Sequence, residues 1–303
     1  GLALAGCLLL ALAGCGQAAR AAVPPARAAP FLLGLADPVA VPTAPPLAYD
    51  LGGLVADGPS VTAESAILVD LGSGRVLWSK DPFSRRSIAS LTKLTTALVA
   101  LDLAPPGRVV TVPPELANPR PGQTLMGVEP GQSFTVSELI QAMFVYSAND
   151  AAETLARTLE PRDRFVSDMN AKAAALHLVD THYSNPSGLE GQGHFSSAYD
   201  LAVLAGWLLS RYPVAAGLAG SREMHLPALA EHPAFDSRSV NGILFTYPGA
   251  TGLKTGYTFR AGWCEMATAT RNGRTLLAVT LHSSPAAIFD DAGRVLDFGW
   301  TQP

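Results

Sequence analysis

Asn272-Gly273 stands between two strand-like runs, GWCEMATAT (Gly262–Thr270) and RTLLAVTLH (Arg274–His282). Asn-Gly is the strongest short signal for a two-residue hairpin turn, because both residues tolerate positive φ angles. The pattern therefore predicts two antiparallel strands near the end of the chain. A third predicted strand, which carries Lys254, precedes them.

A second hairpin is predicted nearer the start of the chain. Ala66–Asp70 and Arg75–Lys80 have the character of strands, and the turn Leu71-Gly72-Ser73-Gly74 joins them. Between the two strand regions apolar residues recur with helical spacing, and Thr135-Val136-Ser137-Glu138 resembles a capping box. The predicted helices are 90–103, 136–145, 150–159, 162–178 and 197–210, with a last amphipathic helix at 286–298. We therefore expect a mixed α/β domain in which both chain ends form an antiparallel sheet and a helical subdomain lies between them.

The bulk composition excludes several classes of function. A net charge of −4 gives no electrostatic footprint for nucleic acid. The hydrophobic share of 48% is raised by alanine and by the first fifteen residues, so it does not indicate several membrane spans. The six histidines lack the spacing of metal ligands and no nucleotide-binding loop is present, so we expect neither a metal nor a cofactor.

The first fifteen residues are expected to direct export. Gly1–Gly14 is an apolar run of the length of a signal-peptide core and is too short to span a bilayer comfortably. It ends in Leu12-Ala13-Gly14-Cys15, which resembles the bacterial lipobox, whose cysteine is lipidated after cleavage. An ordinary secretory signal or an uncleaved anchor is the alternative. We predict an export segment at 1–15, an Ala/Pro-rich tether at 16–60 and a catalytic domain at 61–303.

Only four of the 21 basic residues are lysines, and two of these four lie in short motifs that carry chemistry. Ser90-Leu91-Thr92-Lys93 places a hydroxyl and an amine one turn apart at a helix start. A serine becomes a strong nucleophile when an adjacent base takes its proton, and Lys93 is the base nearby in sequence. Lys93 can act only when neutral, which requires burial or a nearby positive charge such as Lys254.

The other two motifs suit substrate binding. Ser147-Ala148-Asn149 falls between two predicted helices, where Ser147 can relay a proton and Asn149 can pair with a substrate amide. Lys254-Thr255-Gly256 offers a cation and a hydroxyl to a carboxylate, and its glycine permits close approach to the strand. Each motif alone has a structural explanation, as a helix cap or an edge-strand lysine. Their occurrence together and in this order favours a single active site.

The chain resembles the D-alanyl-D-alanine carboxypeptidases, which are low-molecular-mass penicillin-binding proteins, from about Val61 to Trp300. The stretches that carry this resemblance are Ala89–Lys93, Ser147–Ala152, Met169-Asn170, Ser184–Leu189, Gly252–Thr258 and Ala261–Cys264. The resemblance implies a β-lactamase/transpeptidase-like fold and an acyl-enzyme reaction. The implied substrates are the D-Ala-D-Ala ends of peptidoglycan stem peptides, and β-lactam antibiotics would be inhibitors. The implied location is the envelope, on the periplasmic side of a bacterial membrane.

The resemblance also implies catalytic roles. Ser90 corresponds to the nucleophile, Lys93 to its base and Ser147 to a proton relay. The backbone N–H groups of Ser90 and Tyr257 correspond to the oxyanion hole.

Substrate-binding roles follow in the same way. Asn149 corresponds to the contact with a substrate amide, and Lys254 and Thr255 to the contacts with the terminal carboxylate. Gly256 and Tyr257 continue that binding strand.

The sequence departs from the family pattern at two places. Thr251 stands where members often carry an acidic residue, and the C-terminal β-rich domain and membrane helix of many members are not found before Pro303. We therefore expect anchoring through the N-terminus, by a lipid on Cys15. Cys264 lies in a strand-like run and is expected to be a small buried side chain rather than a nucleophile.

Three alternative functions stay open on the sequence. A serine β-lactamase shares the motifs, and its class A form needs a deacylating glutamate, for which Glu160 and Glu190 lack a convincing context. A DD-endopeptidase that cuts peptidoglycan cross-links differs in cleft width, which the sequence does not show. A non-catalytic penicillin-sensing module is disfavoured by the intact Ser90, Lys93 and Lys254.

Overall fold

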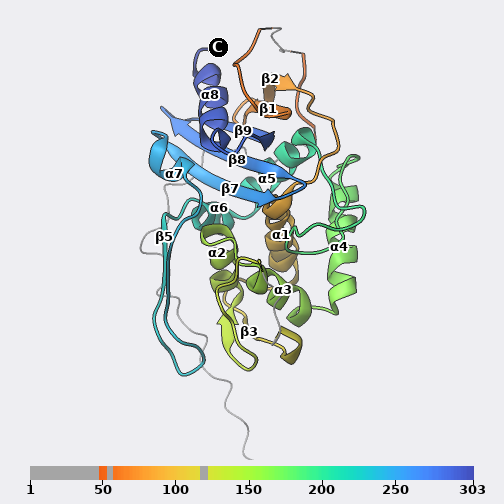
Figure 1. Cartoon of the computed structure of the whole chain (residues 1–303), viewed down its shortest axis with the longest axis vertical. Helices are drawn as coiled ribbons and strands as arrows, with labels where there is room; N and C mark the ends of the chain where they lie inside the picture. Colours follow the sequence, from red (N-terminus) through yellow and green to blue (C-terminus); the bar gives the residue numbers. More distant parts are fainter. Residues whose placement is uncertain (1–47, 53–56, 117–121) are drawn as a thin grey trace, which may run out of the picture.

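The computed structural model describes residues 48–52, 57–116 and 122–303. Its centre is a five-stranded antiparallel sheet with the strand order β2-β1-β9-β8-β7 (Figure 1). The strands are β1 (Ser65–Asp70), β2 (Arg75–Lys80), β7 (Ala250–Thr258), β8 (Gly262–Arg271) and β9 (Arg274–Ser283). The prediction of one sheet built from both ends of the described domain is confirmed.

Both predicted hairpins form. Asn272 and Gly273 adopt positive φ angles of 51° and 78° between β8 and β9, as a tight turn with Asn-Gly requires. β1 then pairs with β9, with Ile67 opposite Val279 and Leu68 opposite Ala278. The N-terminal hairpin is thereby joined to the C-terminal strands at the middle of the sheet.

The sheet separates two apolar cores. Leu68 and Ala278 pack with Val295 on the face covered by α8 (Ile288–Trp300), whereas Ile67 and Val279 belong to the core on the other face. This division follows from the alternation of side chains along paired strands. Figure 1 shows the sheet between α8 and the helical layer.

The helical layer lies between β2 and β7 in sequence. Its helices are α1 (Lys93–Leu103), α2 (Val136–Val145), α3 (Asn149–Thr158), α4 (Arg162–Ala175), α5 (Ala198–Arg211) and α6 (Pro213–Ala219), and the one-turn helix α7 (Ile243–Thr246) follows it. The capping box at α2 is present, since Thr135 Oγ1 accepts from the Glu138 N–H while the Glu138 carboxylate accepts from the Thr135 N–H. The predicted start of this helix is therefore correct.

Several short elements were not predicted. They are the helices α6 and α7, the 3-10 helices η1 (Ala89–Thr92) and η2 (Pro114–Leu116), and the two-stranded ribbons of β3 (Val109–Thr111) with β4 (Ser133–Thr135) and β5 (Glu223–Leu226) with β6 (Phe235–Arg238). The predicted helix at 90–103 thus begins with a 3-10 turn. Strands of three or four residues are too short to show a period of their own.

Part of the predicted tether packs against the domain. Tyr49 is buried, and its hydroxyl donates to the Ala202 carbonyl of α5 at 3.1 Å. Asp50 forms a parallel bridge with Arg75. The export segment 1–15 with Cys15, and residues 16–47 and 53–56 of the predicted tether, lie outside the described residues. Among the described helices none alone has the length and apolar character of a membrane span, although α5 and α6 together do, with a bend of 113° between them.

Candidate active site

Ser90 lies in η1, directly before α1 and against the edge strand β7. Ala89 precedes it with a φ of 48°, a conformation that residues with a Cβ atom rarely adopt. Lys93 is the first residue of α1, and its Nζ lies 2.9 Å from Ser90 Oγ. The expected one-turn spacing therefore places the hydroxyl and the amine in direct contact.

The Lys93 amine is fully buried and has three polar contacts. Besides Ser90 Oγ, it donates to Asn149 Oδ1 at 2.6 Å and to the Ser187 carbonyl at 2.7 Å. Burial lowers the pKa of Lys93 well below its usual value, and the positive charge of Lys254 lowers it further, against an opposing contribution from Asp150. The site thus favours the neutral amine, the form that can accept a proton.

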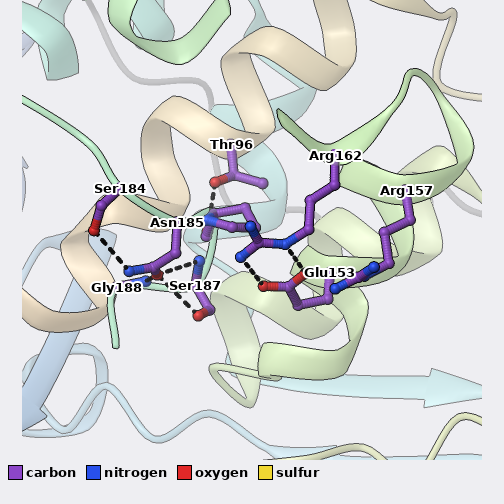
Figure 2. Close-up of polar contacts among 9 residues, drawn as sticks. Thr96, Glu153, Arg157, Arg162, Ser184, Asn185, Ser187 and Gly188 are labelled. Carbon is purple, nitrogen blue, oxygen red and sulfur yellow. Dashed lines mark hydrogen bonds and ion pairs between the residues drawn. The ribbon is translucent and has the colours of Figure 1, made fainter. Parts of the chain in front are cut away.

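The Ser187 carbonyl is presented by a tight turn. Asn185 Oδ1 accepts hydrogen bonds from the Ser187 and Gly188 N–H groups at 3.2 and 2.8 Å (Figure 2). Thr96 of α1 donates to the Pro186 carbonyl at 2.6 Å and ties the turn to the same helix as Lys93. Ser184–Leu189 carries part of the family resemblance, but no role for Ser187 was expected from the sequence. The Asn, Pro, Ser and Gly residues of this stretch indicate a turn, but they do not indicate that the turn contacts Lys93.

The Ser147–Asn149 loop joins α2 to α3, and Asp150 follows it directly. Ser147 has a φ of 64°, and Asn149 is the first residue of α3. The Asp150 carboxylate accepts from three consecutive backbone N–H groups, at residues 126, 127 and 128, with distances of 2.8 to 3.2 Å. Asp150 was part of the quoted motif but was not assigned a role. It ties residues 126–128 to the start of α3, next to Ser147 and Asn149.

Lys254 lies on β7 and is also fully buried. Its Nζ donates to the carbonyl of Thr255, its neighbour, at 2.6 Å. Burial lowers the pKa of Lys254 to about 7, while the nearby Glu265 acts in the opposite direction. Lys254 therefore keeps a substantial cationic fraction near neutral pH, unlike Lys93.

Gly256 brings β7 against the nucleophile. A Cβ atom at this position would lie 2.8 Å from the Ser90 backbone nitrogen and 3.1 Å from the Ala89 Cβ. The sequence analysis expected the glycine to admit a ligand to the strand. In the structure the missing side chain of Gly256 lets the backbone of η1 approach β7 closely. The N–H groups of Ser90 and Tyr257 therefore belong to adjoining segments.

A family model of the D-alanyl-D-alanine carboxypeptidases matches residues 54–284 of the chain. The chain belongs to this family. Among curated members, DacF of Bacillus subtilis (strain 168) is 33% identical over 79% of this chain and 62% of its own length. DacB2 of Mycobacterium tuberculosis is 34% identical over 81% of this chain and 84% of its own length. The chain thus spans less than two thirds of the Bacillus relative.

Solved structures agree with the family assignment. A D-alanyl-D-alanine carboxypeptidase of Mycobacterium tuberculosis H37Rv is 32% identical, with a TM-score of 0.74 over 84% of this chain and 96% of that one. A Streptomyces DD-transpeptidase is 26% identical, with a TM-score of 0.75 over 81% of this chain and 100% of that one. The expected β-lactamase/transpeptidase-like fold is therefore confirmed.

The two glutamates considered for a β-lactamase are both engaged elsewhere. Glu160 follows α3 and lies 3.8 Å from the Arg164 guanidinium. Glu190 Oε1 accepts from the Arg260 backbone N–H at 2.6 Å. Cys264 is buried, and burial raises its thiol pKa to about 12, so it stays protonated in this family fold.

Proposed function

We propose that the protein is a serine-type D-Ala-D-Ala carboxypeptidase that removes the terminal D-alanine from peptidoglycan stem pentapeptides and is inhibited by penicillins. The observation that carries this proposal is the 2.9 Å contact between Ser90 Oγ and a fully buried Lys93 amine whose pKa is strongly lowered. Membership of the carboxypeptidase family supports the choice of substrate.

The reaction begins at Ser90. Neutral Lys93 takes the hydroxyl proton as Ser90 Oγ forms a bond to the carbonyl carbon of the penultimate D-alanine. The N–H groups of Ser90 and Tyr257 stabilise the resulting oxyanion. Ser147 passes its proton to the amine of the departing D-alanine as the peptide bond breaks and takes from Lys93 the proton that came from Ser90, which leaves Lys93 neutral again. Water then attacks the acyl-enzyme and gives up a proton to Lys93, and the ester bond to Ser90 breaks as Lys93 returns that proton to Ser90 Oγ.

Asn149 and the β7 strand hold the substrate. Asn149 Oδ1 is engaged by Lys93, so its amide nitrogen serves the substrate carbonyl upstream of the cut bond. Cationic Lys254 and the Thr255 hydroxyl bind the terminal carboxylate. Gly256 keeps this strand close to Ser90.

Acylation by benzylpenicillin tests the nucleophile. Mass spectrometry of the treated protein is expected to find the adduct on the peptide that contains Ser90, and Ser90→Ala to abolish it. Ser73→Ala, in the turn between β1 and β2, is the matched control and should be acylated normally. An adduct that persists in Ser90→Ala would refute the assignment.

The competing function is endopeptidase cleavage of cross-links. Chromatography of digested muropeptides measures free D-alanine from pentapeptides together with loss of cross-linked dimers. We expect release of D-alanine to be clearly faster. A digest that loses dimers while pentapeptides persist would make the protein an endopeptidase.

We also propose that the exported protein is anchored by a lipid on Cys15. The apolar run before it, the lipobox-like Leu12–Cys15 and the Ala/Pro-rich stretch after it support this. Labelling of the full-length gene product with a fatty-acid probe should be lost in Cys15→Ala and kept in Cys7→Ala. Unchanged label and membrane fraction in Cys15→Ala would contradict the proposal.

A further inference from the structure

A polar cavity of about 500 Å³ opens next to the catalytic residues. Asn149 and Ser187, which both accept hydrogen bonds from Lys93, form part of its wall. Neither Lys254 nor Thr255 is among the residues that line it. With the terminal carboxylate at Lys254 and the preceding amide at Asn149, the cavity lies on the upstream, acyl side of the cut bond.

One face of α3 leads from the catalytic site into this cavity. Asn149, Glu153 and Arg157 are spaced by four residues, so they form a row along the helix. Each step of four residues advances about 6 Å along a helix axis. Glu153 and Arg157 are therefore within reach of a side chain one or two residues upstream of the D-Ala-D-Ala dipeptide.

The wall at this point carries more positive than negative charge. Arg162 Nε and Nη2 donate to the two Glu153 oxygens at 2.8 and 2.9 Å, and Arg157 Nε donates to Glu153 Oε2 at 3.2 Å (Figure 2). Two guanidinium groups thus share one carboxylate. Arg157 uses one of its five N–H donors in this contact and Arg162 uses two, so donors remain at the cavity wall.

The two guanidinium groups are open to the cavity. The side chains of Arg157 and Arg162 are 31% and 28% exposed, so they are partly desolvated yet open to the cavity. The lining also holds Asp150, which accepts from backbone N–H groups, and Glu190, which accepts from the Arg260 N–H. Glu115, in η2, is a third acidic residue of the lining. Guanidinium groups match carboxylates in geometry as well as in charge.

We propose that Arg157 and Arg162, held in place by Glu153, form a subsite for a carboxylate of the stem peptide upstream of D-Ala-D-Ala. This inference rests on the proposed carboxypeptidase function and deepens it. The subsite selects substrates that carry a free carboxylate on the residue before the dipeptide over those in which that group is an amide. It takes no part in the bond-breaking steps.

Two synthetic peptides test the subsite. Both end in D-Ala-D-Ala; one carries an α-aminoadipyl residue before it and the other carries the side-chain amide of that residue. The wild-type protein is expected to release D-alanine from the carboxylate peptide with a kcat/KM roughly tenfold higher, the value of one charge-assisted contact. In Arg157→Gln and Arg162→Gln the preference should fall to about twofold or less, mainly through KM.

The control variant is Arg164→Gln. Arg164 belongs to α4 like Arg162 but pairs with Glu160 and Asp168 outside the cavity, and it should keep the full preference. Benzylpenicillin acylation should be normal in every variant, which checks that each is folded with an intact nucleophile. Because Arg157 makes one contact with Glu153, Arg157→Gln is the milder change if Arg162→Gln fails to fold.

The outcomes separate the subsite from the function. Equal kcat/KM for the two peptides, or a preference that survives in Arg157→Gln, overturns the subsite while leaving the carboxypeptidase intact. If neither peptide is hydrolysed, the same peptides are used as competitors of benzylpenicillin acylation. A tenfold stronger competition by the carboxylate peptide that is lost in Arg157→Gln then supports the subsite although the hydrolytic function fails.

Discussion

Lys93 in the helical layer and Lys254 on the sheet edge are both fully buried, yet their surroundings differ. The Lys93 amine contacts Ser90 Oγ and donates to Asn149 and to the Ser187 carbonyl, whereas the Lys254 amine donates to the carbonyl of its own neighbour. Lys93 has the charge of Lys254 nearby and a pKa far below the usual value, and Lys254 has Glu265 nearby and a pKa of about 7.

The comparison shows that burial alone does not assign a role to a lysine. Burial is the largest cause of the lowered pKa at both positions, and the positive charge of Lys254 lowers the pKa of Lys93 further. The positive charge of Lys254 helps to keep Lys93 neutral. One lysine is thereby suited to accept a proton and the other to hold a carboxylate.

Lys93→Arg should have the largest effect. A guanidinium cannot be deprotonated in a protein, so the base is lost while the positive charge remains. We expect the rate of acylation by a fluorescent penicillin, followed on gels, to fall by about 10³- to 10⁴-fold. A rate within tenfold of the wild type would remove Lys93 from the role of base.

Lys254→Arg should have a smaller effect of another kind. The charge is retained but a planar fork replaces a compact ammonium, so KM for a D-Ala-D-Ala peptide should rise by roughly tenfold to a hundredfold. Acylation should continue at a reduced rate in the same fluorescent assay. Complete loss of acylation in both the Lys93→Arg and the Lys254→Arg protein would contradict the distinction between the two lysines.

The pH dependence of KM sharpens the comparison. Lys254 is cationic below its pKa of about 7 and neutral above it, so carboxylate binding is strongest on the acid side. From pH 6 to pH 8 the cationic fraction falls from about nine tenths to about one tenth, and KM should rise roughly tenfold. Lys254→Arg keeps its charge over this range and should give a flat KM. A flat profile in the wild-type protein would contradict the role of Lys254.

Glu265→Gln should have the smallest effect on activity and a visible effect on stability. Glu265 is fully buried opposite Thr255, with the side chain of Asn241 and the charge of Lys254 nearby. Burial raises the pKa of Glu265 well above its usual value. The folded state then binds a proton that the unfolded state releases above pH of about 4.3, so stability falls as pH rises from there toward the folded pKa.

In Glu265→Gln this component of the pH slope should disappear. Urea denaturation at several pH values between 5 and 8 measures it, with the Asp236→Gln protein, altered at an exposed carboxylate of β6, as the control. The activity should stay within about twofold of the wild type. A shift of the KM profile to lower pH in Glu265→Gln would instead show an ionised Glu265 that holds the charge of Lys254.

The sequence predicted those features of the fold and of the site that depend on residues close together along the chain. The Asn272-Gly273 turn, the Thr135 capping box and the contact between Ser90 and Lys93 are such features, and the structure contains all three. The contact of Lys93 with the Ser187 carbonyl joins residues 94 positions apart and involves a backbone atom. A pattern of side chains in the sequence therefore cannot predict it.

Other missed features have the same origin. Asp150 acts on backbone N–H groups of a distant loop, and Gly256 is required by the approach of η1 rather than by a ligand. Glu265 is a charged residue in a predicted strand, yet the structure buries it fully. These roles depend on tertiary packing, which local patterns in a single sequence do not predict.

The pairing of β1 with β9 has a consequence for how the chain reaches its native state. β1 contacts β2 on one side and a strand about two hundred residues later on the other. A lone two-stranded hairpin has little stability in water, so the β1–β2 hairpin becomes stable only when the C-terminal strands pair with it. Closing so long a loop costs entropy before any contact rewards it, and pairings of this kind fold slowly. Synthesis must therefore reach β9 before the sheet that holds Lys254 beside Ser90 can assemble. For a chain that crosses a membrane before it folds, this delay keeps the polypeptide open until nearly all of it is available.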